Sequence, residues 1–189
     1  ITSFEIKASV GNSLSTVKTI HVLPAKVYDF QNETVNTQAI GWPATSVVKE
    51  IDGNKYVYAN GRSDFTIGNL FANQTTGYAV FECDIQKISA RDTETYMQFK
   101  TAANKWKSGN KSRFENAGFA ASSTRFVGNN EGDWFNLKLE GNLAEKNYNV
   151  YINGFKVTEE PIACEGESDR LIFNNMIRLE SNASIDNIK

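Results

Sequence analysis

The segment from Asp133 to Val157 constrains the fold more than any other part of this 189-residue chain. Two runs within it alternate apolar with polar residues, a pattern typical of strands that bury one face and expose the other. The polar stretch 141–146 between the runs predicts an antiparallel hairpin, and Asn153-Gly154 predicts a second tight turn, because these residue types tolerate positive φ. The segment therefore predicts a β meander with one apolar face. Its apolar positions are Phe135, Leu137, Leu139, Tyr148, Val150 and Ile152.

Shorter runs of the same kind, separated by turn signals, continue from Val27 to the end of the chain. No stretch shows a sustained helical period, so the sequence predicts an all-β fold in which two antiparallel sheets pack face to face. Further strands are expected at 47–50, 56–59, 77–86, 95–100, 112–121 and around 177–179. The side chains expected inside are Phe81, Met97, Phe99, Phe135, Leu137, Leu139, Val150 and Ile152.

Composition excludes some classes of partner. The formal net charge is −2 with acidic and basic residues interspersed, which argues against nucleic acid and gives no attraction to an anionic membrane. No apolar run is long enough to span a bilayer. Neither an initiator Met nor a signal peptide is present, which predicts a processed chain or an excised fragment. The scarcity of Pro and Met beside plentiful Asn, Gly, Thr and Tyr favours a secreted or cell-surface protein.

Cys83 and Cys164 are the only cysteines. Cys83 shares its predicted strand face with Phe81 and Ile85, which favours a small buried hydrophobic residue over a reactive thiol. A disulfide between the two cysteines is possible in an oxidising compartment, but spacing alone does not establish it. Two unpaired thiols are the expectation.

Three pieces of the chain, in order, resemble concanavalin A-like and laminin-G-like β-sandwich modules. The opening residues 28–34 lead to Gly41-Trp42, the central meander begins at Trp134 and contains Y-x-V-Y-I-N-G, and the closing strand reads S-I-D-N-I-K. The resemblance covers 26–189 and implies a jelly-roll sandwich with Trp42 and Trp134 buried. It also implies a structural Ca²⁺ held by Asp29 and Asp186, since calcium prefers hard oxygen ligands. The alternative for both aspartates is turn capping.

Residues 1–23 are predicted to form an element separate from the sandwich. They read as a hairpin of strands at 4–8 and 17–22, similar to the last hairpin of bacterial Ig-like or PKD-like domains. Leu23-Pro24-Ala25 is the expected linker, because proline ends a strand and stiffens the joint. The expected organisation is therefore an N-terminal hairpin at 1–23 and a sandwich at 26–189.

The catalytic sets of enzymes with this resemblance are incomplete here. Retaining glucanases carry E-x-D-x-x-E, whereas this chain has Glu82 and Asp84 followed by Lys87 in place of the second glutamate. Alginate-type lyases need a Gln-x-His pair, and the sole histidine, His21, lies in the N-terminal hairpin. A Ser or Cys triad fails for the same reason. The expectation leans away from an enzyme.

Polar and aromatic residues on two predicted strands instead suggest a binding face. Aromatic rings stack on the C–H faces of sugars, and amide or charged groups hydrogen-bond to hydroxyl pairs. Exposed tyrosines and lysines are also common on sheets that bind nothing. The predicted ligand-binding residues are Tyr96, Gln98, Lys100, Trp106, Arg113 and Glu115, with Arg125 in an adjoining loop and Trp134, Asn136 and Tyr151 flanking them.

The sequence thus predicts a non-catalytic carbohydrate-binding module that recognises a polysaccharide or oligosaccharide. It is expected to act as a monomeric unit within a larger secreted, polysaccharide-acting protein. Two alternatives stay open: a polysaccharide lyase or glycoside hydrolase of the same fold, and a laminin-G-like adhesion or spacer domain.

Overall fold

The computed structural model describes residues 2–10, 13–22, 27–61, 63–66, 78–87, 95–98, 100–101, 111–115, 118–121, 124–127, 132–142, 144–163, 171–172, 176–179 and 182–189. Every regular element in these ranges is a strand. The described residues accordingly contain no helix that is long and apolar enough to cross a membrane.

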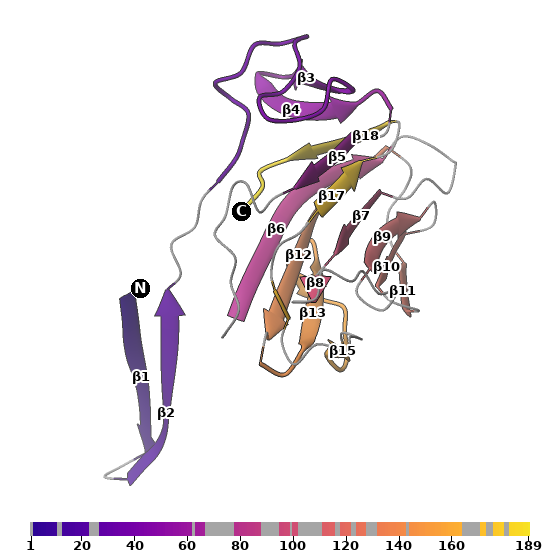
Figure 1. The fold of residues 1–189 in the computed structure, drawn as a ribbon. Helices are drawn as coiled ribbons and strands as arrows, with labels where there is room; N and C mark the ends of the chain where they lie inside the picture. The colour runs from indigo at the N-terminus through magenta and orange to yellow at the C-terminus, as the bar shows by residue number, and fades with distance from the viewer. Residues whose placement is uncertain are drawn as a thin grey trace.

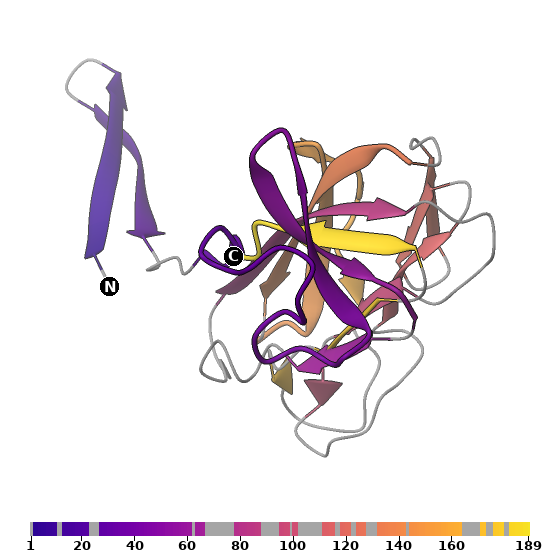
Figure 2. The same cartoon turned by 90° about the horizontal axis from the view of Figure 1, so that it is seen from above.

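Two large sheets form the body of the molecule as two layers (Figures 1 and 2). The first has the order β14-β13-β12-β6-β18-β4-β3, with β15 paired to β13, and the second has the order β11-β10-β9-β7-β17-β5. The eight strands of the first sheet are β3 (Ser46–Ile51), β4 (Asn54–Ala59), β6 (Tyr78–Lys87), β12 (Trp134–Asn142), β13 (Asn147–Ile152), β14 (Phe155–Lys156), β15 (Ile162–Ala163) and β18 (Ala183–Asp186). The six strands of the second are β5 (Ser63–Thr66), β7 (Thr95–Gln98), β9 (Lys111–Glu115), β10 (Gly118–Ala121), β11 (Thr124–Val127) and β17 (Met176–Leu179).

The eight-stranded sheet buries one face as the alternation predicts. Side chains along β12 are buried at every second position, and β12 pairs with β6 so that Leu137 lies opposite Cys83. Phe81, Phe135, Leu137, Leu139 and Val150 are buried, which confirms their predicted positions, while Ile152 is half-buried at the margin of the core. The side chain of Met97 and the whole of Phe99 lie outside what the structure describes.

One tryptophan differs from its expectation. Trp42 is buried in the core, where its ring meets that of Phe30 edge-on at 6.0 Å between centroids. Trp134 is only half-buried, because it starts the run on the same parity as Asn136 and therefore lies on the face opposite to Phe135. There its ring packs edge-on against Tyr56.

Two tight turns close the hairpins of this sheet at the predicted dipeptides. Asp52 and Gly53 have φ of 51° and 80°, and Asn153 and Gly154 have φ of 50° and 81°. These paired left-handed values match the twist of a two-residue hairpin turn. The turn between β12 and β13 is shorter than predicted, because β12 continues to Asn142 and pairs there with Asn147.

Two runs that the sequence predicts as strands are each divided into two shorter strands in the structure. The run 95–100 separates into β7 and a short strand β8 (Lys100–Thr101), which pairs with β16 (Leu171–Ile172) in a sheet of its own. The run 112–121 becomes the antiparallel pair β9 and β10. Both runs were predicted as single strands.

The opening and closing segments of the sandwich meet. Tyr28 and Ile188 form an antiparallel bridge in which each backbone N–H donates to the other's carbonyl, at 2.8 and 3.0 Å. This bridge brings the neighbourhood of Asp29 to the end of β18. It also fixes both ends of residues 27–189 against the eight-stranded sheet, since β18 pairs with both β4 and β6.

The N-terminal residues form the expected hairpin. Strands β1 (Thr2–Val10) and β2 (Ser13–Val22) pair with each other in a two-stranded sheet (Figure 1). The expected linker residues lie outside the described ranges.

Candidate functional site

Four of the predicted binding residues come together on two neighbouring strands of the six-stranded sheet. Tyr96 of β7 lies directly opposite Arg113 of β9 in an antiparallel pair. Gln98 and Glu115 each lie two residues further along their strands. Opposed residues, and residues two apart on one strand, share a face of a sheet. The four positions therefore belong to one contiguous patch.

The same face continues over the other strands of the sheet, and we call it the Tyr96 face. By register its positions are Asp64, Thr66, Lys111, Arg113, Glu115, Gly118, Ala120, Arg125, Val127, Met176, Arg178, Tyr96 and Gln98. Arg125 was expected in a loop but lies in β11, and Arg178 was missed. The alternation of Met176 and Arg178 with Ile177 and Leu179 was the available signal.

The opposite face of the six-stranded sheet contains one position whose burial the structure describes, Ser63. Ser63 belongs to that face and is fully buried, and its register partner is Leu179. By register, the other positions on the same face as Ser63 are predominantly apolar and include Phe65, Ile177, Met97, Phe114, Phe119 and Phe126. This pattern predicts that the Tyr96 face is the outward one, as expected for a sheet with one side packed and one side solvated.

Other predicted binding residues do not join this face. Lys100 belongs to β8 rather than to the six-stranded sheet, and Trp106 lies outside the described residues. Trp134, Asn136 and Tyr151 lie in the eight-stranded sheet, so they do not flank Tyr96. The prediction failed for them because alternation assigns a face within a strand but does not say to which sheet that strand belongs.

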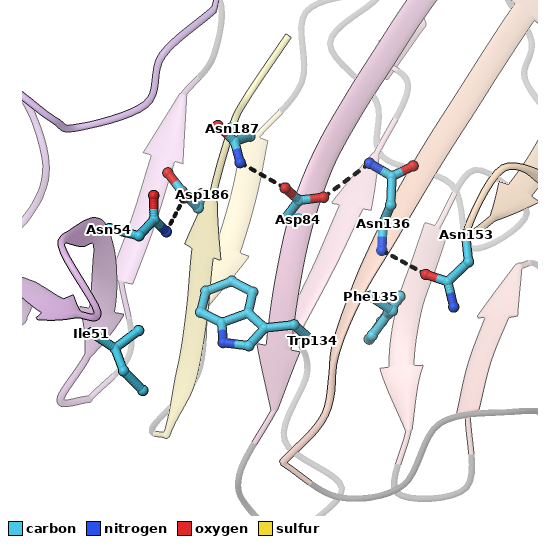
Figure 3. A pocket seen from close by; sticks show the side chains of 9 residues that line it. All are labelled: Ile51, Asn54, Asp84, Trp134, Phe135, Asn136, Asn153, Asp186 and Asn187. Carbon is cyan, nitrogen blue, oxygen red and sulfur yellow. Dashed lines mark hydrogen bonds between the residues drawn. The ribbon is translucent and has the colours of Figure 1, made fainter.

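Trp134 and Asn136 instead line a hollow of about 350 Å³ on the outward face of the eight-stranded sheet (Figure 3). Two aspartates on neighbouring strands stand in its wall, since Asp186 of β18 lies directly opposite Asp84 of β6. The lining residues are Ile51, Asn54, Asp84, Trp134, Phe135, Asn136, Asn153, Asp186 and Asn187.

Asparagine side chains hold the carboxylate of Asp84 from both sides. Asn136 donates Nδ2–H to its Oδ1 at 2.9 Å, and Asn187 donates Nδ2–H to its Oδ2 at 2.7 Å (Figure 3). The Asn153-Gly154 turn in turn fixes Asn136, because the Asn136 backbone N–H donates to the Asn153 Oδ1 at 2.9 Å. The turn predicted from the sequence therefore positions one wall of the hollow.

Asp186 is the incompletely satisfied group of the hollow. The residue is 1 % exposed; Oδ2 accepts a hydrogen bond from Asn54 at 2.9 Å, whereas Oδ1 has no hydrogen-bond partner. Burial raises the pKa of Asp186 above its ordinary value of 3.8, hydrogen bonds from Asn54 and the Asn187 backbone oppose this, and the charges of Asp84 and Asp29 raise it further. A buried carboxylate beside another carboxylate is unfavourable unless it gains a proton or a cation.

These residues fit the expected calcium site in part. The orphaned Oδ1 of Asp186 is a hard oxygen without a donor, and Asp29 is near enough to act on its pKa. No three His, Cys, Asp or Glu side chains converge as a metal-binding group in the described part of the chain. Calcium at this position would therefore take most of its six to eight ligands from amide and backbone oxygens.

Glu82 and Asp84 project on one face of β6, and both have protein partners. Asn136 Nδ2 donates to Glu82 Oε1 at 3.1 Å as well as to Asp84. Lys189 also pairs with Glu82 Oε1 at 3.3 Å. Both carboxylates of the pair are thus engaged by neighbouring protein groups.

No protein-family model matches the sequence, and no curated protein matches it. Solved structures do. An alginate lyase mutant in complex with an alginate trisaccharide aligns with a TM-score of 0.53 and 13 % identity, over 86 % of this chain and 95 % of that chain. The globular domain of T. cruzi calreticulin aligns with a TM-score of 0.51 and 10 % identity, over 86 % of this chain and 87 % of that chain.

The Trypanosoma rangeli sialidase aligns with a TM-score of 0.51 and 12 % identity over 82 % of this chain, which spans only 29 % of the sialidase. Identities this low establish the fold and leave the activity open. The described sheets and these alignments together identify the chain as an all-β protein with a concanavalin A-like β-sandwich.

Proposed function

We propose that this chain is a non-catalytic carbohydrate-binding module whose Tyr96 face binds a polysaccharide. The observation that carries the proposal is the register of β7 and β9, in which Tyr96 lies opposite Arg113 while Gln98 and Glu115 occupy the same face. An aromatic ring, an amide and charged groups within one patch supply both stacking and hydrogen bonding for a sugar ring.

The comparisons support a sugar ligand only indirectly. One structural neighbour is an alginate lyase in complex with an alginate trisaccharide, so a sandwich of this shape accommodates an oligosaccharide in at least that protein. We propose that the module acts within a larger secreted or cell-surface protein, which the composition rich in Asn, Gly, Thr and Tyr favours.

We propose binding without cleavage because the carboxylates of Glu82 and Asp84 are both engaged by protein groups. Glu82 is engaged by Lys189 and Asn136, and Asp84 is engaged by Asn136 and Asn187. Neither is free to serve as the proton donor that a retaining mechanism needs beside its nucleophile.

We also propose that Asp186 and Asp29 help to hold a structural Ca²⁺. The unpartnered Oδ1 of Asp186 and the mutual repulsion of the nearby carboxylates support this assignment. A bound cation would neutralise that repulsion at the point where the opening and closing segments meet.

The function is tested by affinity electrophoresis of the full chain against plant cell-wall and algal polysaccharides. The same mixtures are assayed for new reducing ends and for the ultraviolet absorbance of unsaturated products. Retardation by at least one polysaccharide without products is the expected result. Single modules with a shallow face bind in the micromolar to millimolar range, about −4 to −8 kcal/mol.

The other outcomes separate the alternatives. Sustained release of reducing ends that disappears in Glu82→Gln would favour a glycoside hydrolase, and unsaturated products would favour a lyase. Neither retardation nor turnover across a broad panel would favour an adhesion or spacer domain.

A further inference from the structure

The Tyr96 face contains a row of residues that crosses the six-stranded sheet from edge to edge. Successive register pairs connect Asp64 with Arg178, Arg178 with Tyr96, Tyr96 with Arg113, Arg113 with Ala120, and Ala120 with Arg125. A single line perpendicular to the strands therefore meets three arginines. Arg113 and Arg125 are 12 residues apart in the chain, Arg125 and Arg178 are 53 apart, and strand pairing brings all three into line.

The arginines recur at regular intervals along this row. Arg178 is in β17, Arg113 in β9 and Arg125 in β11, so one strand intervenes between each neighbouring pair. Strands in a sheet lie about 4.8 Å apart, which separates successive arginine positions by about 10 Å. Tyr96 occupies the intervening strand in the first interval, and the small residue Ala120 occupies it in the second.

The charge of the Tyr96 face differs in sign from that of the whole chain. Four of its positions are basic, Lys111, Arg113, Arg125 and Arg178, and two are acidic, Asp64 and Glu115. The chain as a whole has a formal net charge of −2. Asp64 ends the row at the β5 edge, so the basic part of the row extends from β17 to β11.

We infer that the ligand of this face is an acidic polysaccharide of the uronic acid class, lying across the strands. The inference rests on the proposed function and specifies its ligand. In an extended 1,4-linked uronate chain, alternate residues present their carboxylates on the same side, and two sugar rings span a length comparable to two strand spacings. Arginine is suited to this role because its guanidinium group forms paired hydrogen bonds with a carboxylate.

The test measures binding of the full chain to mannuronate, guluronate and galacturonate oligosaccharides by titration calorimetry. Each oligosaccharide is compared with its carboxyl-reduced form, which has the same linkage and length without the charge. Calcium is left out so that the uronates stay soluble. At least one uronate should bind at least ten-fold more tightly than its reduced partner, and its affinity should fall as salt is raised from low to physiological concentration, because exposed charge pairs are screened.

Two charge-removing variants locate the site. Arg178→Gln and Arg125→Gln should each weaken uronate binding roughly three- to ten-fold, a range expected for charge-assisted contacts that are partly exposed. Lys49→Gln in β3 of the eight-stranded sheet is the matched control and should bind as the unmodified chain does. Arg178→Lys keeps the charge and should recover part of the affinity.

The failures of the two proposals are distinguishable. Equal binding of the uronates and their reduced forms would overturn the acidic ligand while leaving a polysaccharide-binding module in place. Uronate binding that Arg178→Gln and Arg125→Gln leave unchanged would overturn the role of the row. If none of these oligosaccharides and none of the neutral polysaccharides bound, the proposed function would fail and this inference with it. The salt dependence and the reduced oligosaccharides use the unmodified chain, so they decide the ligand class even if a variant fails to fold.

Discussion

Asp84 and Asp186 lie directly opposite each other on β6 and β18, and both side chains line the same hollow (Figure 3). Asp84 is fully engaged by two asparagines, whereas Asp186 retains one buried oxygen without a partner. Like charges directly opposite each other across a ladder are destabilising. This pair is therefore the point at which the sandwich should respond to charge removal, pH and cations.

Replacing Asp186 by Asn should raise the melting temperature at pH 7 in the presence of EDTA. The substitution removes a buried charge that lies opposite the carboxylate of Asp84 and keeps an acceptor for Asn54. The exposed Glu159→Gln is the matched control and should change the melting temperature little. A variant that melts below the unmodified chain in EDTA would show that the carboxylate of Asp186 is stabilising without a cation.

The contribution of Asp186 to the stability of the unmodified chain should depend on pH with a definite sign. Because the folded-state pKa of Asp186 is raised above 3.8, the native state binds more protons than the unfolded state from about that pH upward. The contribution of Asp186 to stability should therefore fall as pH rises through this window and stay low above the folded pKa. Thermal melts across the acid range, with the Asp186→Asn profile subtracted, measure it, and a difference that rises with pH would contradict the assignment.

Calcium should raise the melting temperature of the unmodified chain, in which Asp186 keeps its charge. An ion that binds only the native state raises the melting temperature by mass action, so the unmodified chain should melt higher in calcium than in EDTA. Asp186→Asn should lose most of this difference, and Asp29→Asn should reduce it. Superimposable melts of the unmodified chain in calcium and in EDTA would remove the ion from the account.

Leu137→Ala tests the buried face of β12. The side chain is fully buried opposite Cys83, so its truncation should lower the free energy of unfolding by about 2 to 5 kcal/mol. Lys156→Ala, on an exposed position of β14, should change it by less than about 0.5 kcal/mol. Denaturant unfolding of both variants provides the comparison, and equal small effects would mean that the face of β12 is wrongly assigned.

Cys83 should resist thiol reagents while the protein is folded. It is a free, fully buried thiol, and burial raises its pKa well above the ordinary value, with Asp84 and Glu82 raising it further. In a Cys164→Ser variant, labelling should be slow in buffer and complete in denaturant, because the thiolate is the reactive form. Rapid labelling of the native variant would contradict the burial of β6.

The sequence predicted the fold best where one face of a strand is buried. Alternation placed Leu137 and Val150 inside, and the Asp52-Gly53 and Asn153-Gly154 dipeptides marked turns that require positive φ. Parity also contained the information that Trp134 shares a face with Asn136. The resemblance implies a buried Trp134, whereas parity places it on the face of Asn136, and the structure agrees with the parity.

Non-local pairing limited what the sequence revealed about the sites. Asp84 and Asp186 are far apart in the chain and meet only because β18 inserts between β4 and β6. Arg178 reaches the Tyr96 face for the same reason, since β17 pairs with β7. Alternation gives the face of a residue within its strand, but the neighbours of that strand depend on the order of the whole sheet.

The most direct test of the proposed binding face is the affinity of Tyr96→Ala for a polysaccharide that the unmodified chain retains, measured beside Tyr78→Ala. Both variants remove a tyrosine from a strand, but Tyr78 is exposed on β6 in the eight-stranded sheet. If the Tyr96 face binds the ligand, Tyr96→Ala should weaken binding by one to a few kcal/mol, as loss of a central aromatic contact does, while Tyr78→Ala should leave it unchanged. Weakened binding in Tyr78→Ala with normal binding in Tyr96→Ala would place the ligand on the other sheet and contradict the account.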